Sequence, residues 1–188
     1  MNDQKPIGNR TCLYSTMQLD GVIGNMARQA AGLLTARTLI TVVGILRRGA
    51  PLADRLCAKL KQDYGGGNIR RLDLSIKRYA DDLTLLHPET KLTEAPEQAL
   101  LDLTGHTVLV VDDVMYQGHS MLRAVQYLAQ KKPAEIRTVV LVDRGVAKLP
   151  VRTDVIGVRL DVAQGDIIEC NVPPYEDEFK IELLQPLR

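Results

Sequence analysis

The sequence predicts an α/β fold with a central, mostly parallel sheet flanked by helices. The apolar run at residues 108–111, within a strand expected at 107–112, is typical of a central strand buried on both faces, and a second buried strand is expected at 136–142. Strand-like and helix-like segments alternate along the chain, which is the order that places helices between parallel strands. A chain of 188 residues, 45% of them hydrophobic, can bury a full core, so we expect one domain over residues 1–188.

The first third of the chain is expected to contain an arm, a helix and a strand. Residues 1–14 begin with the polar stretch MNDQKPIGNR, and we expect a loose N-terminal arm there. Apolar side chains recur at helical spacing over residues 15–37 and predict a helix with one buried face. The apolar run at residues 38–46 predicts a strand directly after this helix.

A second helix, a second strand and a long irregular stretch are expected next. Pro51 suits the first turn of a helix, which we expect to run to about Lys61. A glycine run at residues 65–67 breaks the chain, and alternating polarity over residues 69–76 predicts a strand nearer the sheet edge. Residues 78–105 have no clear periodicity, and a stretch of that length in a compact domain is usually a functional lid or a disordered loop.

The second half of the chain returns to regular elements. After the strand at 107–112, apolar spacing predicts a helix over residues 120–130, followed by the buried strand at 136–142. Two short strands are expected at residues 155–160 and 167–170. The last third has no convincing helix, so we expect a small strand-rich region over one end of the sheet.

Composition narrows the class of protein. The formal net charge is +1, which gives no general attraction to nucleic acid or to a membrane. Cys12, Cys57 and Cys170 form no CxxC pair, and three free thiols in a reducing cytosol are expected. The polar N-terminus lacks the apolar core of a signal peptide, and no apolar run approaches transmembrane length. We therefore expect a cytoplasmic protein without a membrane partner.

The stretch VLVVDDVMYQGHS, at residues 108–120, carries the strongest chemical signal. Asp112 and Asp113 follow four apolar residues, and so should lie at the carboxyl end of a buried strand, where open α/β sheets bind ligands. Two like charges there are costly unless a cation, donors or ligand hydroxyls meet them. Gly118 permits a tight turn, and Ser120 starts a helix whose N-terminus favours an anion. The unit can hold a phosphate at one end and vicinal hydroxyls at the other, as in a phosphorylated sugar.

Other interpretations of this stretch remain open at this point. It is neither a GxxxxGK[ST] phosphate loop nor a GxGxxG dinucleotide turn. VLVVDD is similar to the first strand of a response-regulator receiver domain, whose acidic pair binds Mg²⁺, but here a strand, a helix and another strand precede it. Two solvated carboxylates in an ordinary loop are the simplest alternative.

Four segments together resemble one enzyme family. VLVVDDVMYQGHS is similar to the phosphoribosyl-pyrophosphate (PRPP) signature of type I phosphoribosyltransferases. GILRRGAPLA at 44–53, YADDL at 79–83 and LVDRG with LPVRTD within 141–154 resemble its PyrR-like branch, the pyrimidine-operon regulators with uracil phosphoribosyltransferase activity. The resemblance runs in order from about residue 15 to 160 and implies the type I phosphoribosyltransferase fold, with a small hood and a flexible lid loop.

The resemblance implies a role for each matching residue toward PRPP. Asp112 and Asp113 would bind the ribose hydroxyls, and Arg48 with Gly49 would form the pyrophosphate loop. Asp112, Asp113 and Arg48 would be the catalytic residues. The 5′-phosphate would be cradled by five consecutive residues: Tyr116, Gln117, Gly118, His119 and Ser120.

The base, the metal and the covering segments follow from the same resemblance. Asp143, Arg144 and Gly145 would lie near the nucleobase. Asp113 and Asp154 would help to hold Mg²⁺, the latter through water. Residues 78–105 would form the lid that excludes water, and residues 144–188 the strand-rich hood. A homodimer or higher homo-oligomer is also implied.

The sequence departs from the branch at five positions. Gln117 and Ser120 replace threonines of the signature, and Ser120 keeps the hydroxyl. His119 stands where the branch has Arg, so a fixed positive charge is lost near neutral pH. Arg47 replaces a Thr, and Ala80 replaces an Arg of the lid. These changes bear on catalytic rate and substrate identity, but they leave the acid pair and the turn intact.

Three functions are compatible with the sequence. The first is a uracil phosphoribosyltransferase that makes UMP and pyrophosphate in pyrimidine salvage, or a relative that uses another base. The second is a nucleotide-sensing regulator that binds pyrimidine-operon mRNA for transcription attenuation with little or no catalysis; the near-neutral charge counts against it, because RNA phosphates need a basic surface. The third is a degenerate relative that binds PRPP or a nucleotide for another purpose.

Overall fold

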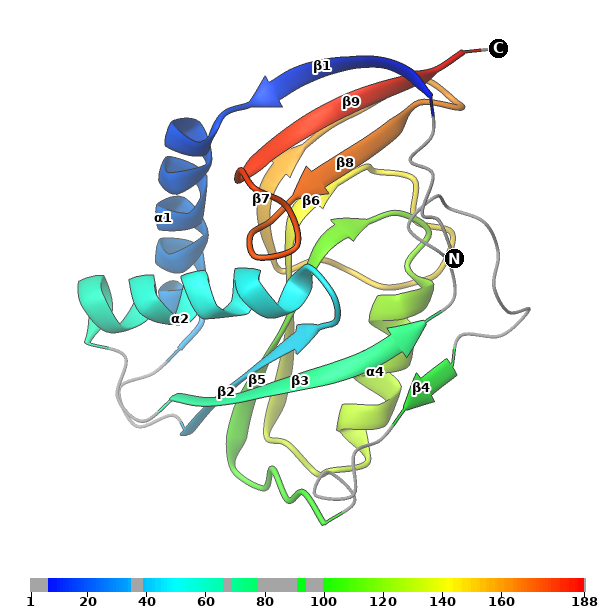
Figure 1. Ribbon diagram of the computed structural model, residues 1–188. Coiled ribbons are helices and arrows are strands. Elements are labelled where there is room, and N and C mark those ends of the chain that lie inside the picture. Colours follow the sequence, from blue (N-terminus) through cyan, green and yellow to red (C-terminus); the bar gives the residue numbers. More distant parts are fainter. Residues whose placement is uncertain (1–6, 35–38, 66–68, 78–90, 94–99, 188) are drawn as a thin grey trace.

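The main sheet has six strands in the order β4-β3-β2-β5-β6-β7, and its strands are parallel except for β4 (Figure 1). The computed structural model describes residues 7–34, 39–65, 69–77, 91–93 and 100–187. The strands of this sheet are β2 (Leu39–Ile45), β3 (Ile69–Lys77), β4 (Lys91–Thr93), β5 (His106–Met115), β6 (Glu135–Asp143) and β7 (Val155–Arg159). The predicted α/β class and mostly parallel sheet are confirmed.

Helices cover both faces of the sheet (Figure 1). Helices α1 (Thr16–Gly32) and α2 (Gly49–Tyr64) pack on one face, and α4 (His119–Ala129) packs on the other. Along β5, Leu109 and Val111 join the core under α1 and α2, while Val108 and Val110 join the core under α4. All four side chains are at most 1% exposed, so the predicted burial of this strand on both faces is confirmed.

Local sequence explains where the first two helices begin and end. Ser15 and Gln18 form a capping box at the start of α1, which satisfies N–H groups that the helix leaves unpaired. This helix ends at Gly32, earlier than the predicted residue 37. Helix α2 extends from Gly49 to Tyr64, and Gly65 ends it in the left-handed conformation at φ 58°.

A second, three-stranded antiparallel sheet forms the hood. Its order is β1-β9-β8, with β1 (Gly8–Tyr14), β8 (Ile167–Asn171) and β9 (Lys180–Pro186). The expected loose arm is therefore wrong for residues 8–14, which pair with β9. The strand escaped sequence analysis because its partner lies at the other end of the chain. Strand β7 follows residue 144 but belongs to the main sheet, so the strand-rich region after that residue is divided between the two sheets.

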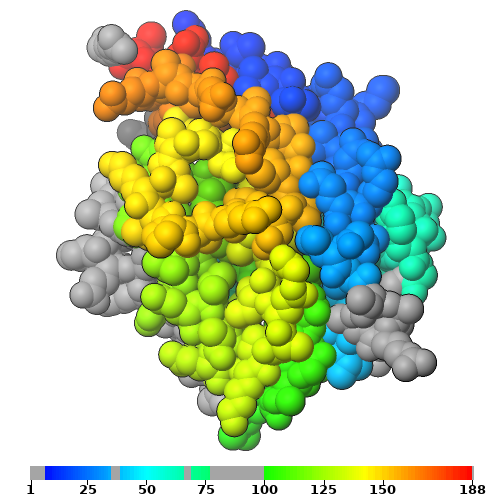
Figure 2. Space-filling view, turned by 180° about the vertical axis from the view of Figure 1, so that it is seen from behind, coloured from blue at the N-terminus to red at the C-terminus, as the bar shows by residue number. Residues whose placement is uncertain are grey.

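The hood lies above the carboxyl ends of the central strands (Figure 1). Its Cys170, Val172, Phe179 and Ile181 side chains join the core under α1 and α2. The Thr16 hydroxyl donates to the Phe179 carbonyl at 2.8 Å. Figure 2 shows from behind that the orange segment containing β7 lies against the blue helix α1. One continuous core therefore fixes the hood to the main sheet.

Only part of the stretch predicted as a lid can be described. Residues 91–93 form β4, which pairs with β3, and residues 78–90 and 94–99 lie outside the described residues. Leu101 and Leu103 are buried in the core under α4, so residues from about 100 onward anchor this stretch to the sheet. Ala80 and the YADDL segment fall outside the described part of the chain.

Cys12, Cys57 and Cys170 are free thiols, as expected, and the last two are buried. Among the helices that the structure describes, none combines the length and the apolar character needed to span a membrane.

Close packing of β2 against α2 depends on Gly44. A Cβ atom at this position would lie 2.6 Å from the Ala50 Cα atom, a distance that requires backbone movement. We expect Gly44→Ala to lower the free energy of unfolding by about 2 kcal/mol through overpacking. Gly21→Ala is the matched control: a Cβ atom there meets nothing within 4 Å, and in mid-helix it should stabilise by about 0.5–1 kcal/mol. Equal effects of the two changes in urea denaturation would contradict this account.

Candidate functional site

The acid pair lies near the carboxyl end of β5, just beyond its fully buried segment. The strand continues to Met115, three residues past the predicted end, so Asp112 and Asp113 are held in regular strand geometry. Both side chains are half-buried. The Asp113 N–H donates to Asp112 Oδ1 at 2.9 Å, and the Val114 N–H donates to Asp113 Oδ1 at 3.0 Å. The predicted carboxylates are thus adjacent and mostly removed from solvent.

Burial makes it costly to ionise these carboxyl groups. Burial, together with the neighbouring Asp113 carboxylate, holds the pKa of Asp112 well above its ordinary value. The pKa of Asp113 is also raised by burial, while the Arg48 guanidinium acts in the opposite direction. A cation or hydroxyl donors at this position would offset the cost of the two charges.

The turn after β5 leads directly into helix α4. Gly118 has φ 89°, a conformation that side-chain-bearing residues rarely adopt, and the Leu122 N–H donates to its carbonyl at 2.9 Å. The Lys148 N–H donates to the Gln117 carbonyl at 3.2 Å, which ties the turn to the neighbouring loop. Tyr116, Gln117, His119 and Ser120 are half-buried. The first N–H groups of α4 and its dipole make this turn suitable for an anion.

The β2–α2 loop presses against β5 beside the acid pair. A Cβ atom on Gly49 would lie 2.5 Å from the Val111 carbonyl oxygen and 3.1 Å from the Asp112 Cα atom, so glycine permits this approach. Arg48 precedes this glycine, and its charge acts on the pKa of Asp113. The peptide bond between Leu46 and Arg47 is cis. The structure therefore brings Arg48 and Gly49 together with Asp112 and Asp113.

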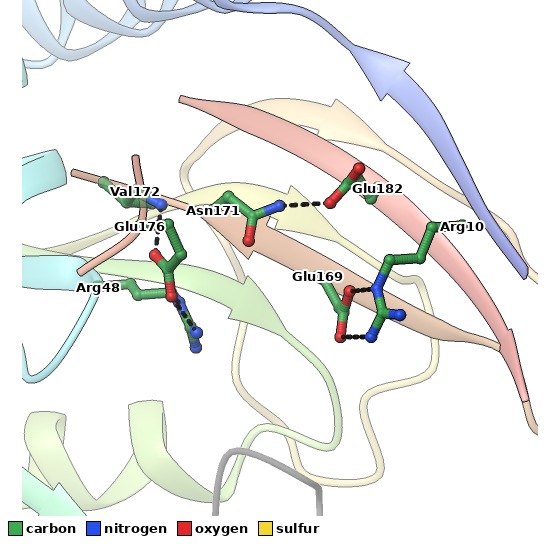
Figure 3. A network of polar contacts seen from close by, with 7 residues as sticks. All are labelled: Arg10, Arg48, Glu169, Asn171, Val172, Glu176 and Glu182. Carbon is green, nitrogen blue, oxygen red and sulfur yellow. Dashed lines mark hydrogen bonds and ion pairs between the residues drawn. The ribbon is translucent and has the colours of Figure 1, made fainter. Parts of the chain in front are cut away.

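The hood contributes residues that sequence analysis missed. Glu176 Oε1 accepts hydrogen bonds from Arg48 Nη2 at 2.6 Å and Nε at 3.1 Å (Figure 3). The Arg47 guanidinium lies over the Tyr175 ring, 4.9 Å from its centroid. Burial, followed by the Asp113 carboxylate, raises the pKa of the Cys170 thiol. The acidic run at 176–178 after two prolines was the available signal, but nothing in it identified an arginine partner.

The predicted base-binding residues border the turn at residues 116–118. Asp143 ends β6 beside Met115, and its Oδ1 accepts from the Gly145 N–H at 2.8 Å. The Arg144 N–H donates to the Met115 carbonyl at 3.1 Å. The Arg144 guanidinium lies over the Tyr116 ring, 4.7 Å from its centroid, and donates to the Asp166 carbonyl at 3.2 Å. Arg144 is thus buried between the turn and the loop before β8.

Asp154 is not brought to the acid pair. It precedes β7, which β6 separates from β5 in the sheet. Its Oδ2 accepts from the Thr138 N–H at 2.9 Å, and its Oδ1 lies 3.4 Å from Arg137 Nη1. This carboxylate joins the start of β7 to β6 through contacts with Thr138 and Arg137. Within the described ranges, no group of three or more His, Cys, Asp or Glu side chains is arranged to hold a metal ion.

Comparison with known proteins gives consistent results. The phosphoribosyl transferase domain model matches residues 13–178. The chain is 32% identical over 170 residues to the "Bifunctional protein PyrR" of Elusimicrobium minutum, covering 89% of this chain and 92% of that protein. It is 33% identical over 148 residues to the protein of the same name from Deinococcus radiodurans, covering 78% and 79%. A hypoxanthine phosphoribosyltransferase from Staphylococcus aureus has a similar fold, with a TM-score of 0.73 at 14% identity over 94% of this chain and 91% of that one.

The raised pKa of Asp112 predicts a stability cost at neutral pH. Because the folded state holds this proton more tightly than the unfolded chain, the free energy of unfolding falls as pH rises above the ordinary aspartate range and through the raised pKa. Asp112→Asn removes this cost. We expect the variant to be more stable at pH 7 by on the order of 1 kcal/mol, with the difference disappearing near pH 4.

Urea denaturation across this pH range measures the effect, and Asp102→Asn is the control of opposite sign. Hydrogen bonds from Thr104 lower the pKa of Asp102, so its loss should destabilise the fold at neutral pH. If Asp112→Asn is instead less stable than the parent at pH 7, the Asp112 and Asp113 charges are already stabilised by partners in the free protein.

Proposed function

The chain belongs to the phosphoribosyl transferase domain family, in its PyrR-like branch, and on that premise we propose the reaction that it catalyses. It transfers the ribose 5-phosphate of PRPP to a nucleobase and releases pyrophosphate. Uracil is the base that we propose, which gives UMP as the product of a pyrimidine salvage reaction.

The observation that supports this proposal best is the meeting of three elements at one end of the sheet. The acid pair ends the buried part of β5, the turn at 116–118 starts α4, and Gly49 presses the β2–α2 loop against Asp112. PRPP has vicinal hydroxyls flanked by a phosphate on one side and a diphosphate on the other. Carboxylates flanked by two anion-binding loops match this order of groups.

Each element takes one part of PRPP in the proposed complex. Asp112 and Asp113 accept hydrogen bonds from the ribose hydroxyls, which gives the costly carboxylate charges partners. The turn at 116–120 and the N-terminus of α4 receive the 5′-phosphate. Arg48 donates charge-assisted hydrogen bonds to the diphosphate, and Gly49 lets the loop approach it closely.

The proposed chemistry breaks the bond between the anomeric carbon and a pyrophosphate oxygen, and forms a bond from that carbon to a nucleobase nitrogen. The proton that this nitrogen loses passes to the departing pyrophosphate or to water. Positive charge develops on the ribose as the leaving group takes the electron pair. Arg48 stabilises the negative charge that builds on the diphosphate, and the hood limits the access of water. No nucleophilic side chain is required.

The donor set fits a Mg²⁺ ion that arrives with the substrate. Asp112 and Asp113 would hold the ion with the carboxylate oxygens that it prefers as ligands. When bound, Mg²⁺ would neutralise charge on the leaving group. Asp113 remains a proposed ligand, whereas the bonds of Asp154 to Thr138 do not fit this role.

The loop after β6 is the proposed base-recognition segment. Asp143, Arg144 and Gly145 border Met115 and Tyr116, next to the phosphate turn. Backbone donors and acceptors make many of the contacts to a flat base, so the preferred base is determined by comparing turnover with different bases. The membership in the PyrR-like branch is what favours uracil.

An assay of UMP formation from PRPP and uracil with Mg²⁺ tests the proposal. We expect turnover with uracil exceeding that with hypoxanthine, guanine or orotate. The double variant Asp112→Asn with Asp113→Asn should lose about a hundredfold or more in kcat/KM, because the ribose loses its charged acceptors. Asp20→Asn, an exposed position on helix α1, serves as the control. A fully active double variant would remove the acid pair from the mechanism.

Regulation through RNA is a second candidate function, because two of the relatives described above carry the name "bifunctional". It requires a local basic surface on a chain whose net charge is only +1. We expect binding to pyrimidine-operon leader RNA to weaken steeply between 50 and about 200 mM salt, by the release of counterions. Fluorescence anisotropy measures this, and affinity that does not depend on salt or sequence would argue against a regulatory role.

A further inference from the structure

Glu176 reaches from the hood into the loop that is proposed to receive the diphosphate. Its Oε1 takes two hydrogen bonds from Arg48, and its Oε2 accepts from the Val172 N–H at 2.7 Å (Figure 3). The Arg48 and Glu176 side chains are 22% and 10% exposed, so water screens this pair only partly. The Val172 contact orients the carboxylate toward Arg48.

A second contact joins the same two segments. Arg47 lies over the ring of Tyr175, directly before the Arg48–Glu176 pair in both segments. Two consecutive arginines of the β2–α2 loop thus engage two consecutive residues of the hood. The contact also gives a partner to Arg47, which stands where the branch has threonine.

We propose that Glu176 sets the affinity for the diphosphate group by competing with it for Arg48. This inference rests on the proposed phosphoribosyl transfer. In the free protein, the Glu176 carboxylate holds Arg48 as one phosphoryl group of the ligand would. PRPP or pyrophosphate must displace it, and Glu176 takes Arg48 back when pyrophosphate leaves.

The negative charge of Glu176 determines whether this residue strengthens or weakens the binding of the diphosphate. An anionic carboxylate next to the diphosphate position repels the ligand and occupies donors that the ligand needs, so it weakens binding. If Glu176 only positioned Arg48, its removal would weaken binding instead. The two roles therefore predict changes in opposite directions for one substitution.

Glu176→Gln separates these two roles. Glutamine keeps the volume and an oxygen that can accept from the Val172 N–H, but it loses the charge that holds Arg48. We expect the dissociation constants of Mg²⁺–pyrophosphate and Mg²⁺–PRPP, measured by calorimetry on the full chain, to fall about threefold to tenfold. The KM for PRPP should fall with them, and pyrophosphate should become a stronger product inhibitor.

Glu178→Gln is the matched control. It removes the same charge two residues along, from a side chain that is 69% exposed and lies 3.2 Å from Lys180. Its effect on diphosphate affinity should be small, which excludes a change in net charge as the cause. A double-mutant cycle with Arg48→Ala completes the test, because the gain from Glu176→Gln should disappear when Arg48 is absent.

The outcomes distinguish failure of this inference from failure of the proposed reaction. Unchanged or weaker pyrophosphate binding by a folded Glu176→Gln variant would overturn the competition, while turnover by the parent protein would leave the proposed reaction standing. A gain that persists in the Arg48→Ala background would also overturn it. A parent protein that binds neither PRPP nor pyrophosphate would overturn both proposals.

Discussion

The burial of β5 on both faces is the constraint on which the rest of the structure depends. Four fully buried aliphatic residues fix this strand between two helical layers, and its direction then delivers two carboxylates to the edge of the core. The same burial raises the pKa of both carboxyl groups. At the acid pair, stability and ligand affinity are opposed. The two carboxylate charges destabilise the free protein, and the same charges can bind a cation or the hydroxyl groups of a ligand.

Two loops approach the acid pair because small residues allow it. Gly49 lets the β2–α2 loop touch the backbone of β5, and Gly118 turns the chain into α4. In the proposed complex, these loops provide donors for anions on either side of the carboxylates. The hood then covers the site, and its Glu176 forms an ion pair with Arg48. The Asp113 carboxylate, together with burial, raises the pKa of the Cys170 thiol of the hood. The site is therefore assembled from both sheets.

Local patterns carried most of what could be predicted from the sequence. The helices, the positions of the buried strands and the turn after the acid pair have sequence signals that lie within a few residues, so periodicity and Gly118 indicate them directly. Strand β1 could not be predicted, because its polar sequence becomes a strand only by pairing with β9. The Arg48–Glu176 pair was missed for the same reason. For Asp154, similarity to a family motif suggested a metal ligand. In the structure this carboxylate accepts a hydrogen bond from the Thr138 N–H and so links β7 to β6.

The pairing of β1 with β9 has a consequence for the order in which the protein forms during synthesis. The six strands of the main sheet can assemble once residues up to β7 have left the ribosome, but β1 must wait for the last strand before its edge is paired. Until then the nascent chain carries an unpaired N-terminal segment and a core that lacks Phe179 and Ile181. A chain that ends before β9 holds every residue of the candidate site but lacks the strand that pairs with both β1 and β8, so the three-stranded sheet of the hood cannot form in it.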